Sequence, residues 1–339
     1  MSEAQGIHLG KDGTGEQSTC MPRPVKKKHP ETTPSARRIQ RTGPPRPHPL
    51  NKRLRCTAEH SGHNQGLNLA HDMRPTHLTQ HAENVWQSTV KLLPGFTVEV
   101  VPSIASTNSE LMHRAREGSM DPVLLAAEEQ TAGRGRMGKA WHSSRAGQSL
   151  TFSLALPLAP ATWSGLSLVV GLSLAEQLHP DVRLKWPNDL WLHQRKLGGI
   201  LVETASVGQA TEGRRLVVIG VGINIARPDA SQLATVPSGG MAAMPPAGLA
   251  EVCMGQTAGE TLEAVVPALV RDVLRFESEG FPAFAARFAQ RDALFQQTVR
   301  LSDGREGRAE GVDANGALQI NIDGRLQAIT SSEVSVRPC

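Results

Sequence analysis

The sequence has little that would place the chain in a membrane, in the secretory pathway or around a zinc ion. No apolar run among its 339 residues approaches the roughly 18 that a membrane-spanning helix needs. The first 13 residues hold acids and glycines where a signal peptide needs an apolar core. The four cysteines lie far apart without a CxxC pair, which favours reduced thiols over disulfides or a zinc site. These absences predict a soluble, cytoplasmic protein.

Charge is divided unevenly along the chain. Residues 1–80 hold 13 Lys and Arg against 6 Asp and Glu, whereas residues 81–339 hold 23 against 26. The net positive charge of the whole chain therefore belongs to its N-terminal segment, and the remainder is mildly acidic. An acidic body argues against nucleic acid as the main partner, so we expect no DNA binding.

Residues 1–80 form a basic, proline-rich extension that we predict to be disordered. They contain nine prolines and almost no apolar periodicity, so they cannot bury enough surface to offset the entropy of ordering. Two interpretations stay open. The extension is either a functional tail, for nucleic acid or organelle targeting, or a dispensable segment with Met73 as the true start.

Residues 81–294 alternate between strand and helix patterns and predict a mixed α/β domain. Apolar alternation and continuous apolar runs predict strands at 96–101, 122–129, 150–157, 182–186, 197–205 and 215–225. Helical patterns occur at 107–117, 163–178, 258–277 and 281–292. Residues 295–339 place short strands between Asp-Gly and Asn-Gly turns, which predicts a small antiparallel barrel.

A glycine- and arginine-rich loop, QTAGRGRMGKAW at 130–141, is the most informative motif. Its glycines free the backbone to wrap a ligand, and Arg134, Arg136 and Lys139 supply positive charge. Phosphate is the natural ligand for such a loop. Neither a Walker motif nor a dinucleotide fingerprint is present. Taken alone, the loop is equally typical of a solvated, flexible turn.

A second cluster of polar residues surrounds a short hairpin. Asn188 and Asp189 follow the strand stop at Pro187, where ligand sites are favoured, although Asn-Asp is also ordinary turn chemistry. Lys196 enters an apolar strand, so it is either exposed at the hairpin or directed at a bound anion. The paired glycines after Lys196 favour close approach of a ligand or another backbone.

Two further motifs end in polar side chains. The stretch STNSE at 106–110 predicts a helix start with Thr107 as cap and Glu110 three residues later, and its free N–H groups suit a carbonyl or ureido oxygen. The stretch GVGIN at 220–224 ends a buried strand at Asn224, which either lines the same cleft or begins the next turn.

Together these stretches resemble the biotin protein ligases. The motifs STN at 106–108, QTAGRGRMGKAW at 130–141, KWPNDLW at 185–191, KLGGILVE at 196–203 and GVGINI at 220–225 occur in that family's order and approximate spacing. The resemblance covers about residues 95–225 and, in the C-terminal segment, the family's small SH3-like domain. It implies a mixed-sheet catalytic domain of the biotin/lipoate ligase type, similar to class II synthetases.

The resemblance also implies what the motifs do. The biotin-binding residues would be Ser106, Thr107, Asn108, Gln130, Arg134, Gly135, Arg136 and Lys196. Lys196 and Arg136 would be catalytic, Lys196 at the reacting carboxylate and Arg136 in the loop that closes over the adenylate. Nucleotide contacts would come from Arg134, Arg136, Trp141, Asp189 and Asn224, with Trp141 equally typical of a core residue. Mg²⁺ would arrive with ATP, with Asp189 as a candidate contact and no dedicated metal site.

The implied activity is ATP-dependent formation of biotinyl-AMP and transfer of biotin to a lysine of a biotin carboxyl carrier protein, from acetyl-CoA carboxylase or a related enzyme. The extension lacks the composition of the winged-helix repressor domain that many bacterial members carry, so a ligase-only chain is expected, as a monomer or weak homodimer. Two other functions stay open: a lipoate or other acyl protein ligase of the same fold, and a nucleic-acid-binding biotin sensor.

Overall fold

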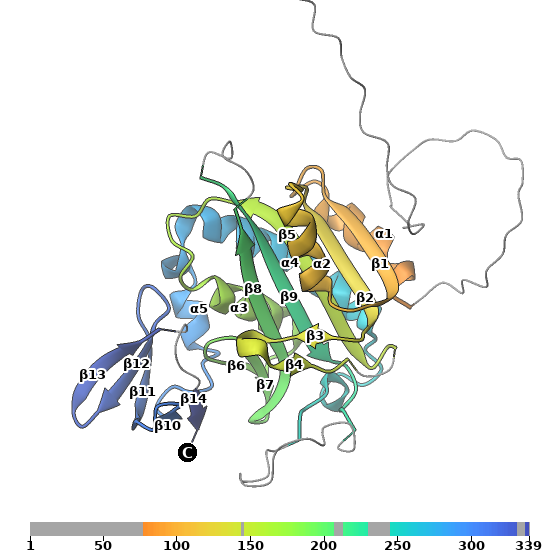
Figure 1. Cartoon of the computed structure of the whole chain (residues 1–339). Helices are drawn as coiled ribbons and strands as arrows, with labels where there is room; N and C mark the ends of the chain where they lie inside the picture. The colour runs from red at the N-terminus through yellow and green to blue at the C-terminus, as the bar shows by residue number, and fades with distance from the viewer. Residues whose placement is uncertain (1–76, 144–145, 207–212, 230–244, 331–335, 339) are drawn as a thin grey trace, which may run out of the picture. The chain divides into compact units, whose positions relative to one another are not determined.

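Most of the chain forms a single sheet with helices on both faces. The computed structural model describes residues 77–143, 146–206, 213–229, 245–330 and 336–338. Seven strands pair in the order β1-β2-β5-β9-β8-β7-β6 (Figure 1). β1 and β2 are parallel, and the other neighbouring strands are antiparallel. The prediction of a mixed α/β domain is confirmed. The predicted disorder of residues 1–80 lies outside the described residues as far as residue 76, and it is wrong for residues 77–80, which are helical.

The elements follow the predicted patterns closely. The strands of the sheet are β1 (Thr97–Ile104), β2 (Val123–Gln130), β5 (Ser149–Leu158), β6 (Val182–Lys185), β7 (Asp189–Leu192), β8 (Arg195–Ala205) and β9 (Arg215–Asn224). A separate hairpin consists of β3 (Gly133–Arg134), the 3-10 turn η1 (Arg136–Gly138) and β4 (Ala140–Trp141). The helices are α1 (His77–Thr89), α2 (Thr107–Arg116), α3 (Leu166–Leu178), α4 (Ala258–Glu279) and α5 (Ala285–Ala289), with short 3-10 turns η3 (Leu249–Glu251) and η4 (Phe281–Ala283).

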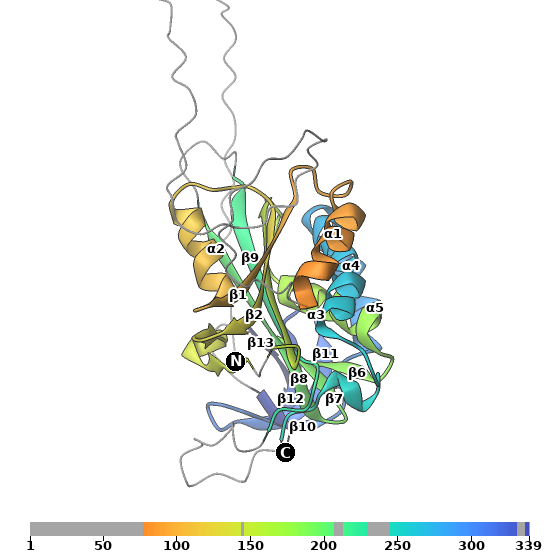
Figure 2. The same ribbon diagram turned by 90° about the vertical axis from the view of Figure 1, so that its right-hand side faces the viewer.

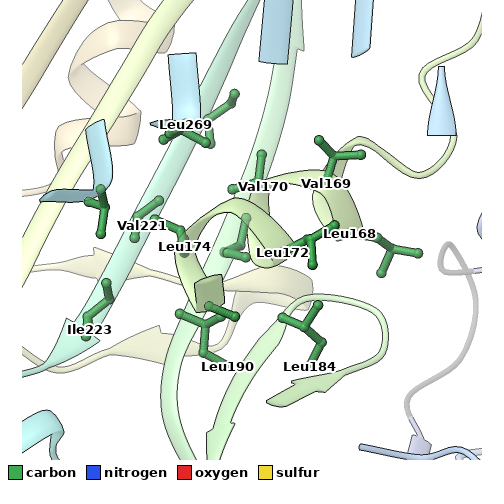
Figure 3. Close-up of a cluster of buried hydrophobic side chains, with 14 of the residues drawn as sticks. Leu168, Val169, Val170, Leu172, Leu174, Leu184, Leu190, Val221, Ile223 and Leu269 are labelled. Carbon is green, nitrogen blue, oxygen red and sulfur yellow. The ribbon is translucent and has the colours of Figure 1, made fainter. Parts of the chain in front are cut away.

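The sheet separates a thin layer from a thick one. α2 covers one face, and α1, α3 and α4 lie on the other (Figure 2). Helix α3 is almost entirely apolar because it is buried between the sheet and α4. Strand β5 is buried along its length, although Ser149, Thr151 and Ser153 alternate on one of its faces. Figure 3 shows leucines and valines of α3 beside Leu190 and Val221 of the sheet and Leu269 of α4. Burial of each such side chain stabilises the folded state by about 1.5–3 kcal/mol. The packing of α1, α3 and α4 therefore fixes the strands whose other face is covered by α2.

The folded part begins earlier than the predicted boundary at residue 81. Helix α1 starts at His77, and its Leu78 is fully buried. The backbone N–H of Leu78 donates to Glu128 Oε1 at 2.9 Å. The boundary was placed too late because Leu78 follows a basic, proline-rich stretch. Leu78, Ala82 and Val85 nevertheless recur at helical spacing, and all three are buried in the core.

The start of α2 also differs from the prediction. Ser106, not Thr107, is the N-cap, since its side chain accepts a hydrogen bond from the Ser109 N–H. Adjacent hydroxyl residues compete for the cap, and the sequence does not distinguish them. Because Ser106 takes the cap, the Thr107 hydroxyl is free for contacts with the sheet.

The C-terminal residues form a second, smaller sheet. Its strands are β10 (Thr298–Leu301), β11 (Glu306–Val312), β12 (Leu318–Ile322), β13 (Arg325–Ile329) and β14 (Val336–Pro338), in the order β13-β12-β11-β10-β14. All pairs are antiparallel, as predicted, but among the described residues β13 and β14 do not pair, so no closed barrel is formed.

The two sheets are connected at the end of β6. The predicted helix at 281–292 is short: α5 ends at Ala289, and the following residues pair with β6 through hydrogen bonds of the Leu184 backbone to Arg291 and Ala293. The indole N–H of buried Trp186 donates to the Gly316 carbonyl at 3.0 Å.

None of the described helices is long and apolar enough to cross a membrane.

Candidate functional site

A pocket of about 190 Å³ opens on the α2 face of the sheet, between the start of α2 and the β3–β4 hairpin. Figure 1 shows the hairpin lying in front of the sheet. The pocket brings together ten of the residues singled out in the sequence: Ser106, Thr107, Asn108, Gln130, Arg134, Gly135, Arg136, Trp141, Asp189 and Lys196. Motifs as far apart in the chain as STN at 106–108 and GVGIN at 220–224 therefore line one cavity.

Glycines make room for the pocket in the floor of the sheet. A Cβ at Gly220 would lie 2.4 Å from Asn108 Oδ1, and one at Gly222 would lie 2.4 Å from a ring carbon of Trp141. Real Cβ contacts do not come so close, so larger residues at either position would displace these side chains. The two glycines of the GVGIN motif thus let one amide and one indole lie directly on β9.

One end of the pocket is a buried network of neutral hydrogen-bonding groups. Gln130 Oε1 accepts from the Thr107 backbone N–H at 2.7 Å and lies 3.1 Å from the Thr107 hydroxyl. The Thr107 hydroxyl also lies 2.8 Å from Ser153 Oγ, which donates to Asn108 Oδ1 at 2.8 Å. Asn108 Nδ2 donates to Glu203 at 2.8 Å. This end suits an uncharged ligand group that both donates and accepts hydrogen bonds.

The other end is lined by cations. Arg136, Lys185 and Lys196 surround one carboxylate, Asp189, and Lys139 also lines the pocket. Lys196 Nζ lies 2.8 Å from Asp189 Oδ1, and Lys185 Nζ lies 4.0 Å from Asp189 Oδ2 and 5.4 Å from the centre of the Trp191 ring. The excess of positive charge favours a polyanionic ligand such as a phosphate chain.

The β3–β4 hairpin closes over both ends. Arg134 reaches the polar end, where its guanidinium lies 3.3 Å from Ser109 Oγ and 3.9 Å from Glu203. Arg136 reaches the cationic end and donates to Asn188 Oδ1 at 3.3 Å. Burial lowers the pKa of the Arg136 guanidinium, and the charge of Asp189 opposes this effect. Met137 directly follows Arg136 in the hairpin, has a left-handed φ of 55° and is largely exposed.

Trp141 lies at the base of this hairpin. Its ring covers Gly222 on the sheet, and its indole nitrogen is buried with no hydrogen-bond partner among the described residues. Trp141 therefore lines the pocket, which favours the ligand-covering interpretation over a core tryptophan. An unpartnered indole N–H inside a ligand pocket is also a donor that a bound molecule can satisfy.

Asn224 does not line the pocket. Its side chain is buried further along β9, where Nδ2 donates to the Ala247 carbonyl at 3.1 Å. The Ala247 N–H in turn donates to the Lys196 carbonyl at 2.9 Å. Asn224 therefore supports the backbone that carries Lys196, and this geometry does not favour direct contact with a nucleotide. The sequence pattern located the strand end correctly but not the segment that covers it.

Several residues in or beside the pocket carried no ligand role in the sequence analysis. Ser153 was not singled out, although Ser149, Thr151 and Ser153 alternate along β5. Lys185 and Asn188 line the pocket, and Glu203 bonds to Asn108 beside it, but each was only part of a quoted motif or turn. Lys185 could have been identified in the sequence because it is a charged residue at the end of a strand, two residues before Pro187. For Glu203 the available signal was the presence of an acid in an otherwise apolar strand.

The described residues do not offer a protein cage for a metal ion. Among them no group of three or more His, Cys, Asp or Glu side chains could hold one. Asp189 Oδ1 already contacts Lys196, so this carboxylate would have to exchange partners before contacting Mg²⁺. The predicted contribution of Asp189 to a Mg²⁺ that arrives with ATP stays a prediction.

Two family matches cover the two domains. Residues 100–224 match the Biotin/lipoate A/B protein ligase family, and residues 297–337 match the Biotin protein ligase C terminal domain. The first match spans the sheet and the pocket. The second spans the small C-terminal sheet, in agreement with the SH3-like expectation.

Relatives and solved structures agree with these matches. The chain is 37% identical over 256 residues to the bifunctional ligase/repressor BirA of Escherichia coli, covering 72% of this chain and 75% of that protein. It is 31% identical to the biotin--[acetyl-CoA-carboxylase] ligase of Mycobacterium tuberculosis, covering 70% and 88%. The biotin protein ligase of Aquifex aeolicus, solved with biotin and ATP, superposes with a TM-score of 0.57 at 25% identity, covering 71% and 99%. The chain belongs to the biotin protein ligase family.

Proposed function

We propose that the pocket holds biotin at its polar end and ATP at its cationic end, so that the biotin carboxylate meets the α-phosphate beside Lys196. Activation of biotin with ATP and its transfer to a carboxylase is the function that the family and the relatives support. The observation that carries the arrangement is the excess of three cations, Arg136, Lys185 and Lys196, over the one carboxylate of Asp189 at one end of the pocket, opposite a network of amide and hydroxyl groups.

The first step joins two anions, and the cations make this possible. A carboxylate oxygen of biotin attacks the α-phosphorus, a P–O bond to pyrophosphate breaks, and biotinyl-AMP forms. Lys196 and Arg136 offset the repulsion between the reactants and stabilise the charge on the phosphate oxygens in the transition state. Asp189, which contacts Lys196, holds its ammonium group in position until the anions arrive.

The second step transfers biotin to a lysine of the acceptor protein. The neutral amine attacks the carbonyl carbon of the adenylate, AMP leaves, and the ammonium formed loses a proton. No histidine lines the pocket among the described residues, so we assign this step to positioning of the amine and stabilisation of the leaving phosphate. The β3–β4 hairpin shields the mixed anhydride from water until the amine enters.

The acceptor is proposed to be a biotin carboxyl carrier domain of acetyl-CoA carboxylase or a related enzyme. The experiment that tests the function is ATP-dependent transfer of labelled biotin to such a purified domain. ATP–pyrophosphate exchange measured with biotin and with lipoate then separates a biotin ligase from a lipoate ligase. Exchange with lipoate alone would contradict the proposal.

A DNA-binding function is the alternative, since the similar protein from Escherichia coli is named a ligase and repressor. Residues 1–80 lack the composition of a winged-helix repressor domain, and the remainder of the chain is mildly acidic. Both features argue against DNA binding. A mobility-shift assay of the full chain at physiological salt tests this, because specific retardation of a DNA fragment would contradict a ligase without repressor activity.

A further inference from the structure

Glu203 is a charged residue at the polar end of the pocket, yet it does not line the cavity. It lies on β8 on the same side of the sheet as α2, and its side chain is about one-quarter exposed. Oε2 accepts a hydrogen bond from Asn108 Nδ2, and Oε1 lies 3.9 Å from the Arg134 guanidinium. Both carboxylate oxygens therefore have assigned partners.

A carboxylate can only accept hydrogen bonds, and this orients Asn108. The NH₂ group of Asn108 must face Glu203, so its Oδ1 faces the opposite way, against Gly220 and toward Ser153. At Gly220 a Cβ would clash with this amide, so the close approach fixes where the amide lies. Asn108 has little freedom to choose another orientation.

The orientation of Asn108 then sets the two hydroxyl groups beyond it. Ser153 donates its proton to Asn108 Oδ1, so its oxygen is left to accept from the Thr107 hydroxyl at 2.8 Å. The Thr107 hydroxyl thus has two acceptors beside it, Ser153 Oγ and Gln130 Oε1 at 3.1 Å, so its proton stays within the protein and its lone pairs are left for a ligand. Ser153, Thr107 and Asn108 are all at least 95% buried, so no bulk water competes for these bonds.

We propose that Glu203 is a positioning residue that sets the direction of this hydrogen-bond chain and thereby makes the Thr107 oxygen an acceptor toward the ligand. This inference rests on the proposed placement of biotin at the polar end. The cyclic urea of biotin presents N–H groups to such an acceptor, whereas the dithiolane ring of lipoate has none. Glu203 therefore contributes to ligand selectivity without touching the ligand.

The test is a double-mutant cycle with Glu203→Gln and Thr107→Val, read as biotin affinity in the absence of ATP. A glutamine satisfies Asn108 in either direction, and Arg134 beside it favours the reversed chain, in which Ser153 donates to Thr107 and takes up a lone pair that the ligand would use. We expect Glu203→Gln to weaken biotin binding about tenfold. In the Thr107→Val background the same change should have little further effect, since the acceptor is already lost.

A matched control is Glu117→Gln at the far end of α2, which removes an exposed carboxylate paired with His113 and should leave affinity unchanged. Unchanged affinity in Glu203→Gln, or losses that add fully in the double variant, would overturn the inference. Should Glu203→Gln unfold, Ser153→Ala breaks the middle link and must give the same non-additive loss. A wild-type protein that does not bind biotin would instead contradict the proposed function.

Discussion

Lys196 and Asp189 form an ion pair of 2.8 Å across the hairpin between β7 and β8, at the cationic end of the pocket. Asp189 also lies within 4.0 Å of Lys185. One carboxylate thus positions two ammonium groups, and the backbone behind Lys196 is held by a hydrogen bond from residue 247. Lys196 therefore lines the pocket although its side chain is nearly half exposed, and its role toward a bound anion stays a prediction.

Replacing Lys196 with Ala should slow biotinyl-AMP formation by about 10²–10³-fold, because it deletes a fixed cation where two anions meet; such losses correspond to ~2.7–4 kcal/mol. ATP–pyrophosphate exchange measures this directly. The melting temperature should change little, since the Lys196 side chain is nearly half exposed. Lys91→Ala, which removes an exposed lysine far from the pocket motifs, is the control. Normal exchange in Lys196→Ala would assign the ion pair to structure alone.

Replacing Arg136 with Gly should release biotinyl-AMP from the enzyme. The change removes a partly buried charge that contacts Asn188 and adds backbone freedom to the hairpin, so the closed conformation becomes less favourable. Escaped adenylate reacts with any accessible amine. Streptavidin blotting of a carrier domain mixed with bulk protein should therefore show labelled bystanders.

Arg136→Lys keeps a charge and separates the two causes, since it should leak less than Arg136→Gly. Equal selectivity in wild type and Arg136→Gly, with adenylate still formed, would show that this arginine does not retain the intermediate.

Replacing Gly222 with Ala should disturb the adenylate end of the pocket through Trp141. The new Cβ would fall 2.4 Å from the indole, so the ring and the hairpin that carries it must move. We expect the KM for ATP to rise about tenfold, the order of one hydrogen bond and its packing. If Trp141 is the cause, the change should cost almost nothing in a Trp141→Ala background. A full effect in that background would point to the sheet instead.

Truncation should be tolerated up to α1 and no further. Removing residues 1–76 takes away none of the motifs, and ligase activity should persist. Removing residues 1–80 also deletes the first turn of α1, including fully buried Leu78 and its hydrogen bond to Glu128. Loss of a buried leucine costs about 2–5 kcal/mol, so the longer truncation should melt at a clearly lower temperature. Equal melting temperatures for the two truncations would show that this turn does not stabilise the core.

Stability should depend on pH through Asp292, which follows α5 where the chain pairs with β6. Burial raises the pKa of this carboxyl to about 6, even though it accepts a hydrogen bond from the Leu294 N–H. The folded state therefore binds a proton more tightly than the unfolded state. The resulting stabilisation is complete below pH 4, the ordinary range of an aspartate, and is lost as the pH rises through about 6.

Asp292→Asn keeps the acceptor and removes the titration. At pH 7 the variant should be more stable than wild type by about 1–2 kcal/mol, less than the full shift implies because the residue is partly exposed. Near pH 4 the two proteins should unfold at similar denaturant concentrations. A variant that is less stable at both pH values would show that the carboxylate itself is needed.

Much of this protein was determined by local sequence. Apolar runs located β9 and α3 because elements buried on both sides have almost no polar face to interrupt the pattern. The loop at 130–141, the Asn188–Asp189 stop and Lys196 were identified because glycines, prolines and charges inside apolar stretches are costly unless a ligand or turn requires them. Each of these signals lies within a few neighbouring residues.

Only the tertiary structure decided how those signals combine. Asn108 and Glu203 are 95 residues apart, and Gly220 matters because its missing Cβ leaves room for the Asn108 amide. Asn224 ends the right strand yet is covered by residue 247 and so lies outside the pocket. Hydrogen-bond direction and close approach depend on which strands are neighbours. The pairing of β5 with β9 joins strands that are not consecutive in the chain, and no local pattern encodes it.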